Sequence, residues 1–263
     1  MGFFDIFSGK SSTEEDRAKF DERVLVKNIG GIIFVTLIFP SNTSEFSDYF
    51  ISNIVKIIEK GYPFIKLVPV REDEGQGFTS RYDVQKGYSV ANDLFNVEII
   101  LQLLDTIAKD IPAPKIILIL KEGIYSKTES LPNVHWVYSK SSKYGLVVST
   151  YPLEYKLSQH MSGYYDRNLL KNFAQEFQLN TNDLSQEELY KIFWLSALIF
   201  HELGHALGLS NFSGSHDIMC RPTFVHDVFD KGYKMPESGP ILNDKLKKHN
   251  LKTLDASSPL LSK

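Results

Sequence analysis

Two histidines and a glutamate late in the chain have the residue types and the spacing of a metal site. They lie in the segment His201-Glu202-Leu203-Gly204-His205, which places the two histidines four residues apart. Residues four apart on a helix lie one turn from each other on the same face. Their imidazoles can therefore converge on one zinc ion, at Zn–N distances of about 2.0–2.1 Å. The spacing predicts a zinc site with His201 and His205 as two of its ligands.

Glu202 is the residue of this segment that could carry out acid–base chemistry. It follows the first histidine directly, so it lies about 100° further around the helix and can reach a water beside the metal. Zinc lowers the pKa of such a water towards about 7, and a neighbouring carboxylate can then take its proton. The hydroxide formed would attack a polarised carbonyl group. We therefore interpret Glu202 as the general base, and later the proton donor, of a hydrolytic HExxH site.

A glycine after this segment determines where a third ligand could come from. Gly208 is the seventh residue after the first histidine, and a left-handed conformation there would turn the chain back towards the metal. Asn211 would then face the ion, although its neutral amide is a weaker zinc ligand than an imidazole or a carboxylate. His216 has the better chemistry and is the alternative third ligand. The sequence leaves both residues open, with Asp217 and Glu237 as minor options.

The extended segment HELGHALGLSN, with Met219 eight residues beyond Asn211, resembles the metzincin metallopeptidases. Their pattern is HExxHxxGxxH followed by a methionine-containing turn, the Met-turn. The spacing is similar to that of archaemetzincins and of matrixins, and Val147 to Leu153 resembles the strand that archaemetzincins carry before their active helix. The resemblance implies a zinc-dependent metallopeptidase with Met219 beneath the metal. It also implies a five-stranded sheet above a cleft, the active helix behind it and an irregular subdomain below.

Two departures from the family pattern bear on the metal content and the activity. The third family ligand is histidine, and this chain has Asn211 there. Archaemetzincins also carry cysteines for a second, structural zinc, whereas this chain has Phe212 and Asp217 at two of those positions and a single cysteine, Cys220. We therefore expect one zinc ion per chain and a zinc metalloendopeptidase that hydrolyses peptide bonds. The alternative is a non-catalytic, metzincin-like protein that binds zinc or a peptide through a degenerate third ligand.

The composition excludes several other classes of protein. The chain has 263 residues, of which 43% are hydrophobic and 23% charged, with a net charge of −3 and one cysteine. This is ordinary globular usage for one or two domains, with no disulfide framework and no basic surface for nucleic acid. No stretch resembles a signal peptide or a transmembrane span, so we expect a cytoplasmic protein that does not bind membranes. Its partner would be a peptide or protein substrate, and its oligomeric state stays open.

The elements that would position the site alternate along the chain. We expect a polar tail over residues 1–22, a zincin-like subdomain with the active helix over 23–209, and a C-terminal subdomain with the Met-turn over 210–263. Apolar, β-branched runs predict strands, and helical spacing of apolar residues predicts helices. The expected strands are 31–39, 64–70, 116–120, 134–138 and 146–150, and the expected helices are 44–60, 91–109 and 186–207.

The same patterns predict how the long helix and the sheet are arranged. Ser185 to Glu188 forms a capping-box pattern at the start of the long helix, and Gly208 marks its end. The short polar stretch 139–144 predicts that 134–138 and 146–150 pair antiparallel, with 134–138 as the edge strand on which a peptide substrate could add. The order of elements predicts an α+β fold with a mixed, twisted five-stranded sheet. Together with the family resemblance, this gives a zincin-like (metzincin) fold.

Overall fold

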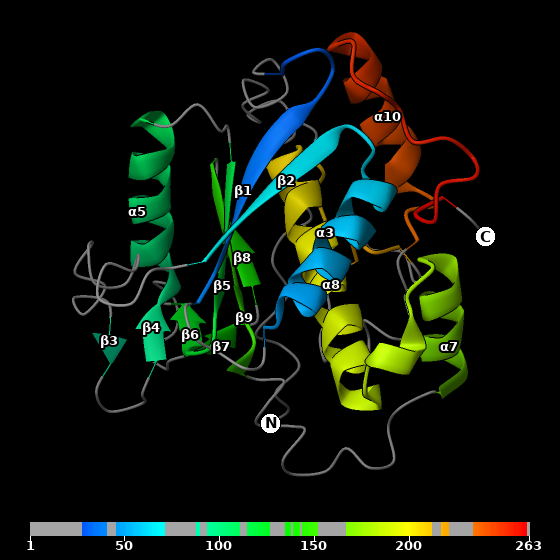
Figure 1. The fold of residues 1–263 in the computed structure, drawn as a ribbon. Helices are drawn as coiled ribbons and strands as arrows, with labels where there is room; N and C mark the ends of the chain where they lie inside the picture. Colours follow the sequence, from blue (N-terminus) through cyan, green and yellow to red (C-terminus); the bar gives the residue numbers. More distant parts are fainter. Residues whose placement is uncertain are drawn as a thin grey trace, which may run out of the picture.

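The computed structural model describes most of the chain. The described residues are 28–40, 46–71, 88–89, 94–110, 115–126, 135–137, 139–142, 144–151, 167–211, 217–220 and 234–261. Within these residues it contains two β-sheets and five α-helices. Figure 1 shows helices on both faces of the larger sheet, so the elements form layers. The tail expected over residues 1–22 lies outside the described residues.

The larger sheet has five strands. Their spatial order is β2 (Ile65–Arg71), β1 (Ile33–Phe39), β5 (Lys115–Leu120), β9 (Gly145–Ser149) and β8 (Ser139–Ser141). The first four strands are parallel, and β8 runs antiparallel to β9 at the edge. All residues of β5 and β9 are buried, which explains their nearly continuous apolar sequences. The expected mixed, five-stranded sheet is confirmed, and its parallel strands make the fold mixed α/β rather than a segregated α+β arrangement.

The edge strand of this sheet differs from the predicted one. We expected residues 134–138 to pair with 146–150. Instead, β8 pairs with β9, and β7 (His135–Val137) pairs with β6 (Gly123–Ser126) in the second sheet. The prediction was wrong because the sequence Ser-Lys-Ser of β8 has no apolar alternation to identify it as a strand. Only its pairing with β9 makes it one.

The second sheet has four strands and was not expected from the sequence. Its order is β3 (Tyr88–Ser89), β4 (Leu94–Asn96), β6 and β7. Because β4 occupies part of the segment predicted to be helical, helix α5 (Val97–Asp110) begins later than expected. The Asn96 side chain accepts a hydrogen bond from the Glu98 backbone N–H at 3.0 Å and so caps this helix.

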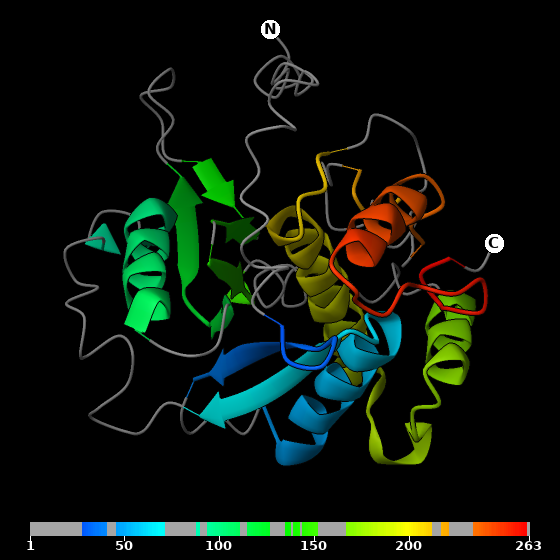
Figure 2. The ribbon, with the colours of Figure 1, turned by 90° about the horizontal axis from the view of Figure 1, so that it is seen from above.

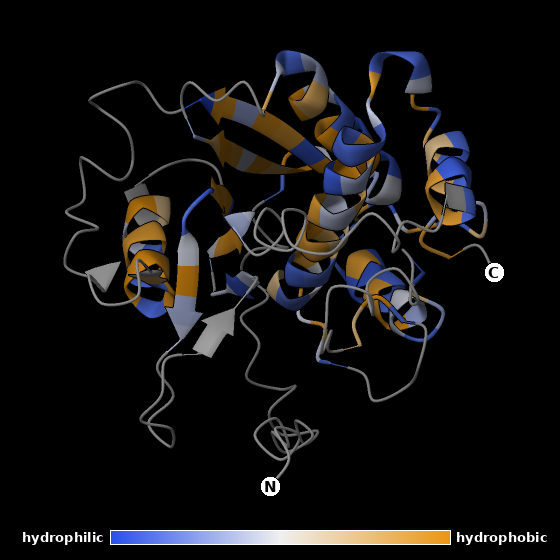
Figure 3. Cartoon of the chain, turned by 90° about the horizontal axis from the view of Figure 1, so that it is seen from below, coloured by the Kyte–Doolittle hydropathy of each residue, from blue (hydrophilic) through white to orange (hydrophobic). Residues whose placement is uncertain are grey.

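Three further helices pack around the larger sheet. Helix α5 covers one face, while α3 (Asp48–Gly61) and α8 (Gln186–Ala206) pack against each other on the other face (Figure 2). Helix α7 (Arg167–Glu176) lies against α8, with the rings of Phe173 and Phe193 edge to face at 5.1 Å. Hydrophobic and hydrophilic residues alternate around α3 and α5 (Figure 3), which is typical of helices with one buried side.

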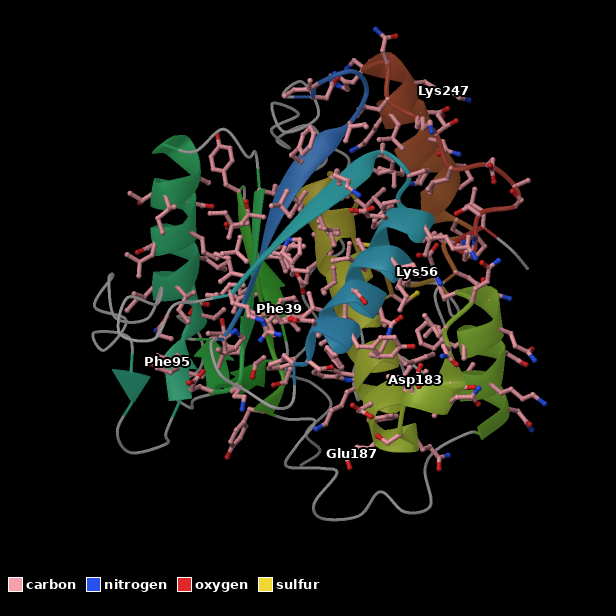
Figure 4. The ribbon with its side chains drawn as sticks, viewed as in Figure 1. Phe39, Lys56, Phe95, Asp183, Glu187 and Lys247 are labelled. Atoms are coloured by element: carbon pink, nitrogen blue, oxygen red, sulfur yellow. The ribbon has the colours of Figure 1, made fainter. Side chains whose placement is uncertain are left out.

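A helix also interrupts the C-terminal subdomain that we expected to be irregular. Helix α10 (Ser238–Lys248) buries Leu242 and Leu246, which lie one turn apart, and exposes Lys247 at the surface (Figure 4). Among the helices in the described part of the chain, none is both long enough and apolar enough to cross a membrane.

Candidate metal centre

The candidate ligands lie in the last two turns of α8, a helix that is fixed at both ends. At its start, the Ser185 hydroxyl accepts a hydrogen bond from the Glu188 backbone N–H at 3.1 Å, and the Glu188 carboxylate accepts one from the Ser185 N–H at 2.9 Å. This is the predicted capping box. At its end, Gly208 has the predicted left-handed conformation, with φ of 88°. The helix is continuous between these ends, so His201 and His205 share one face.

The two imidazoles converge through one nitrogen each. Nε2 of His201 lies 3.1 Å from Nε2 of His205. The other nitrogen of each ring faces a backbone carbonyl. Nδ1 of His201 lies 2.7 Å from the Ile218 oxygen, and Nδ1 of His205 lies 2.9 Å from the Leu209 oxygen. His201 is buried and His205 is half-buried, so the main chain holds both rings from behind.

This arrangement fits a zinc ion. A carbonyl oxygen only accepts hydrogen bonds, so each Nδ1 carries a hydrogen. An imidazole with its single hydrogen on Nδ1 has its lone pair at Nε2, which is the atom that would bind the metal. Two nitrogens bound to one tetrahedral zinc lie about 3.3 Å apart. The observed separation of the Nε2 atoms, 3.1 Å, is close to this value. Histidine ligands commonly donate their second N–H to a carbonyl or carboxylate, which fixes the tautomer. His201 and His205 therefore have the geometry and the hydrogen-bond partners that zinc requires.

Glu202 points from α8 towards the edge strand of the larger sheet. It is 5% exposed, and its Oε1 accepts a hydrogen bond of 2.7 Å from the Ser139 hydroxyl on β8. Ser139 lies opposite Val148 in the register of β8 and β9. The sequence did not single out Ser139, because its place beside the glutamate depends on this pairing and not on any local pattern. The carboxylate is therefore held by a strand as well as by its own helix.

The chain turns back after α8 as predicted, but the identity of a third ligand stays a prediction. The Gly208 N–H donates to the His205 carbonyl at 2.9 Å, and the Leu209 carbonyl returns to the His205 ring. Asn211 follows in an exposed position, and His216 lies outside the described residues. Residues 28–261, as far as they are described, contain no group of three or more His, Cys, Asp or Glu side chains that could hold a metal ion.

Met219 lies beneath the turn of α8 that joins the two histidines. It is fully buried, and a Cβ atom added to Gly204 would lie only 2.2 Å from its sulfur. With the methionine in this position, a larger residue at position 204 would displace its side chain. Cys220, the next residue, is buried as expected for a small apolar side chain. The methionine forms an apolar floor under the histidine-bearing turn.

Asp217 and Glu237 were the two minor candidates for the third ligand. Asp217 is 1% exposed, and its carboxylate accepts hydrogen bonds from the backbone N–H groups of Met219, Glu237 and Ser238. Glu237 is the exposed residue immediately before α10. Because hydrogen bonds occupy both oxygens of Asp217, this carboxylate is not available as a metal ligand.

A buried tyrosine supports the backbone next to the first histidine. The Tyr62 hydroxyl donates a hydrogen bond to the Phe200 carbonyl at 3.1 Å, and the two rings are edge to face at 5.2 Å. Burial raises the pKa of Tyr62 far above its usual value, and the negative charge of Asp217 raises it further. The hydroxyl therefore stays protonated and remains a donor to the carbonyl that precedes His201.

Comparisons with known proteins find structural neighbours but no sequence relatives. No protein-family model matches the chain, and no curated protein is significantly similar to it. An archaemetzincin from Methanopyrus kandleri gives a TM-score of 0.54 at 14% identity, covering 83% of this chain and 97% of the other. An archaemetzincin from Archaeoglobus fulgidus, complexed with malonate, gives 0.46 at 17% identity, covering 76% and 93%. A zinc-dependent peptidase from Methanocorpusculum labreanum gives 0.47 at 13% identity, covering 81% and 99%.

The Methanopyrus kandleri structure establishes the fold to which this chain is similar. Its similarity extends over nearly the whole of that protein and over most of this chain. The expected resemblance is confirmed for archaemetzincins, whereas the matrixin alternative has no specific support in these comparisons. This chain therefore has an archaemetzincin-like fold.

Proposed function

We propose that this protein is a zinc-dependent metallopeptidase that hydrolyses peptide bonds. The observation that carries the proposal is the convergence of the two Nε2 atoms at 3.1 Å, with a backbone carbonyl behind each ring. A buried carboxylate, Glu202, follows directly on the same helix. The fold gives further support, because its Methanopyrus kandleri neighbour is an archaemetzincin.

Each residue has a distinct role in the proposed site. His201 and His205 hold one zinc ion, and Asn211 or His216 completes the ligand set. Zinc bound there would acidify a water and polarise the carbonyl of the peptide bond to be cleaved. Glu202 takes the proton of the attacking water and later gives it to the leaving amine. Ser139 holds one oxygen of this carboxylate, so the other oxygen can take the proton.

The substrate would lie along β8. This strand is the edge of the larger sheet, and its Ser139 contacts Glu202. An extended peptide that adds to this edge by backbone hydrogen bonds would pass beside the carboxylate. Because β8 and not 134–138 is the edge strand of the larger sheet, we propose residues 139–141 as the substrate-binding edge.

A non-catalytic zinc-binding or peptide-binding protein is the alternative function. The observation that favours it is Asn211, which stands where the family has its third histidine. The partly buried hydrogen bond between Ser139 and Glu202 argues against it, because a purely structural zinc site does not need a positioned carboxylate.

Substitution of Glu202 by glutamine separates the two functions. We expect the zinc-loaded wild type to cleave casein, and Glu202→Gln to lower this activity about 100-fold or more, because glutamine cannot accept the proton. Zinc content and Tm should not change, since the side chain keeps its shape. The matched control is Glu187→Gln, on the exposed first turn of the same helix (Figure 4), which should keep full activity.

Two results would count against the proposal. Comparable activity of the Glu202→Gln variant and the wild type would show that the proposed mechanism is wrong. A zinc-loaded wild type that cleaves neither casein nor other unstructured proteins would favour the binding-protein alternative.

A further inference from the structure

Asp217 is a buried carboxylate at the junction between the floor of the site and α10. Its Oδ1 accepts hydrogen bonds from the Met219 N–H and the Ser238 hydroxyl, both at 2.8 Å. Its Oδ2 accepts from the N–H groups of Glu237 at 3.1 Å and Ser238 at 2.9 Å. A negative charge at the first N–H groups of a helix is also stabilised by the helix dipole. Asp217 thus ties residues 217–220 to the N-terminus of α10.

The residue that follows Asp217 is the one that orients the first histidine. The Ile218 carbonyl accepts the hydrogen bond from Nδ1 of His201 at 2.7 Å. The Ile218 N–H donates to the Lys234 carbonyl at 2.7 Å. The Asp217 side chain accepts a hydrogen bond from the Met219 N–H. The Asp217 carbonyl accepts one from the Cys220 N–H at 2.8 Å. Hydrogen bonds therefore fix the backbone on both sides of Ile218, and Asp217 makes two of them.

We infer that Asp217 is a positioning residue of the proposed zinc site. By holding the Ile218 carbonyl against His201, it keeps the hydrogen on Nδ1 and turns the lone pair of Nε2 towards the metal. The effect on metal binding rests on the proposed function. The effect on the tautomer of His201 does not, because it depends only on the contact between Nδ1 and the Ile218 carbonyl.

The hydrogen bonds require a carboxylate at this position. Four donor groups surround the two oxygens of Asp217, and an ionised carboxylate only accepts hydrogen bonds. Asparagine has the same shape but replaces one oxygen by an NH₂ group, which would face donors instead of acceptors. Asp217→Asn therefore keeps the packing and removes the hydrogen bonds on one side of the carboxylate.

The test compares Asp217→Asn with a control variant elsewhere on α10. The control is Asn243→Ala, which removes two side-chain hydrogen bonds from this helix to Leu254, of 2.8 and 2.7 Å, and leaves Asp217 untouched. Zinc dissociation constants would be measured with a competing chelator. The tautomer of His201 would be measured in zinc-free protein by long-range ¹H–¹⁵N NMR.

We expect Asp217→Asn to weaken zinc binding about 10- to 100-fold, as is typical when a residue behind a metal ligand is lost. It should also lower the fraction of His201 with its hydrogen on Nδ1. Asn243→Ala should change neither quantity by more than about twofold. Equal zinc affinities and equal tautomers in the two variants would overturn the inference.

Two other results would have to be distinguished from a failure of the inference. A wild type that binds no zinc would contradict the proposed function, while the tautomer in the zinc-free variants would still decide the role of Asp217. If Asp217→Asn does not fold, Ser238→Ala removes one donor to the carboxylate and keeps the backbone N–H. This variant should weaken zinc binding about threefold, and an unchanged affinity together with an unchanged His201 tautomer would overturn the inference.

Discussion

At the residue scale, the two histidines and the glutamate are held in different ways. Backbone carbonyls of Ile218 and Leu209 orient the imidazoles, whereas the side chain of Ser139 holds the carboxylate. The ring orientations therefore depend on the path of the chain after α8. The orientation of the carboxylate depends on the strand β8. Changes at Ser139 should for this reason affect the reaction and not the metal.

Ser139→Ala should lower kcat and leave zinc affinity unchanged. Loss of the 2.7 Å hydrogen bond frees the carboxylate of Glu202 to rotate, and we expect a decrease in kcat of about tenfold. Ser52→Ala, at an exposed serine on α3 outside the proposed substrate-binding edge, is the matched control. Kinetics on a fluorogenic peptide and zinc titration would measure both effects. Equal kcat values for the two variants would exclude a role for the Ser139 hydroxyl.

The third ligand is decided by a pair of substitutions. If Asn211 holds the ligand position, Asn211→His should tighten zinc binding about tenfold or more, because an imidazole replaces a neutral amide. His216→Ala should then leave the zinc dissociation constant nearly unchanged. Competition with a chelator measures both. Loss of zinc binding in His216→Ala, together with normal binding in Asn211→Ala, would assign the third position to His216 instead.

The residues predicted from the sequence are those whose geometry is local. His201, Glu202 and His205 share two turns of one helix, and Gly208 adopts the conformation expected from its type and place. The choice of Asn211 or His216 as the third ligand stays a prediction. Ser139 was beyond sequence reasoning because it meets Glu202 across 63 residues. The same holds for Asp217, which was considered only as a ligand, because its partner Ser238 lies 21 residues further along the chain.

At the scale of elements, the site depends on the stability of α8. The capping box at Ser185 satisfies backbone N–H groups at the start of this helix, so Ser185→Ala should lower the free energy of unfolding by about 1 kcal/mol at neutral pH. Urea denaturation would measure the loss. Ser52→Ala is the control, because the Ser52 hydroxyl binds only the carbonyl of its own helix, and this change should be nearly neutral.

The effect of Ser185→Ala should also depend on pH. The hydrogen bond from the Ser185 backbone N–H, followed by that from its hydroxyl, lowers the pKa of Glu188 below its usual value. A carboxyl whose pKa is lowered by folding stabilises the protein above its unfolded pKa of about 4.3, and this contribution is lost as the pH falls through the lower, folded value. The difference between Ser185→Ala and the wild type should therefore shrink at pH 3. A difference that is the same at pH 3 and pH 7 would contradict this account.

The elements missed by sequence analysis were missed for two different reasons. Strand β8 has the polar sequence Ser-Lys-Ser and forms only by pairing with β9, so no local pattern predicts it. Helix α7 is different, because its buried residues follow the helical spacing i, i+3, i+4 and i+7. These residues are Leu170, Phe173 and Ala174 in the helix and Phe177 directly after it. That pattern is present in the sequence, and α7 could have been predicted from it.

At the scale of the whole molecule, the described residues after α8 support the turn that carries the histidines. Helix α10 holds Asp217 at its first N–H groups, and the Lys234 carbonyl accepts from the Ile218 N–H behind His201. Helices α3 and α8 pack with the larger sheet in one continuous hydrophobic core. The parallel core strands and the long helix were predictable from apolar runs. The second sheet and these long-range supports were not, because they depend on tertiary contacts.

The position of zinc in a crystal of the metal-loaded protein tests the central claim most directly. Anomalous diffraction at the zinc absorption edge should show one peak per chain, about 2.0–2.1 Å from Nε2 of both His201 and His205. Residue 211 or 216 should supply a third contact. Crystals of protein incubated with zinc that show no peak within bonding distance of these two nitrogens would contradict the account.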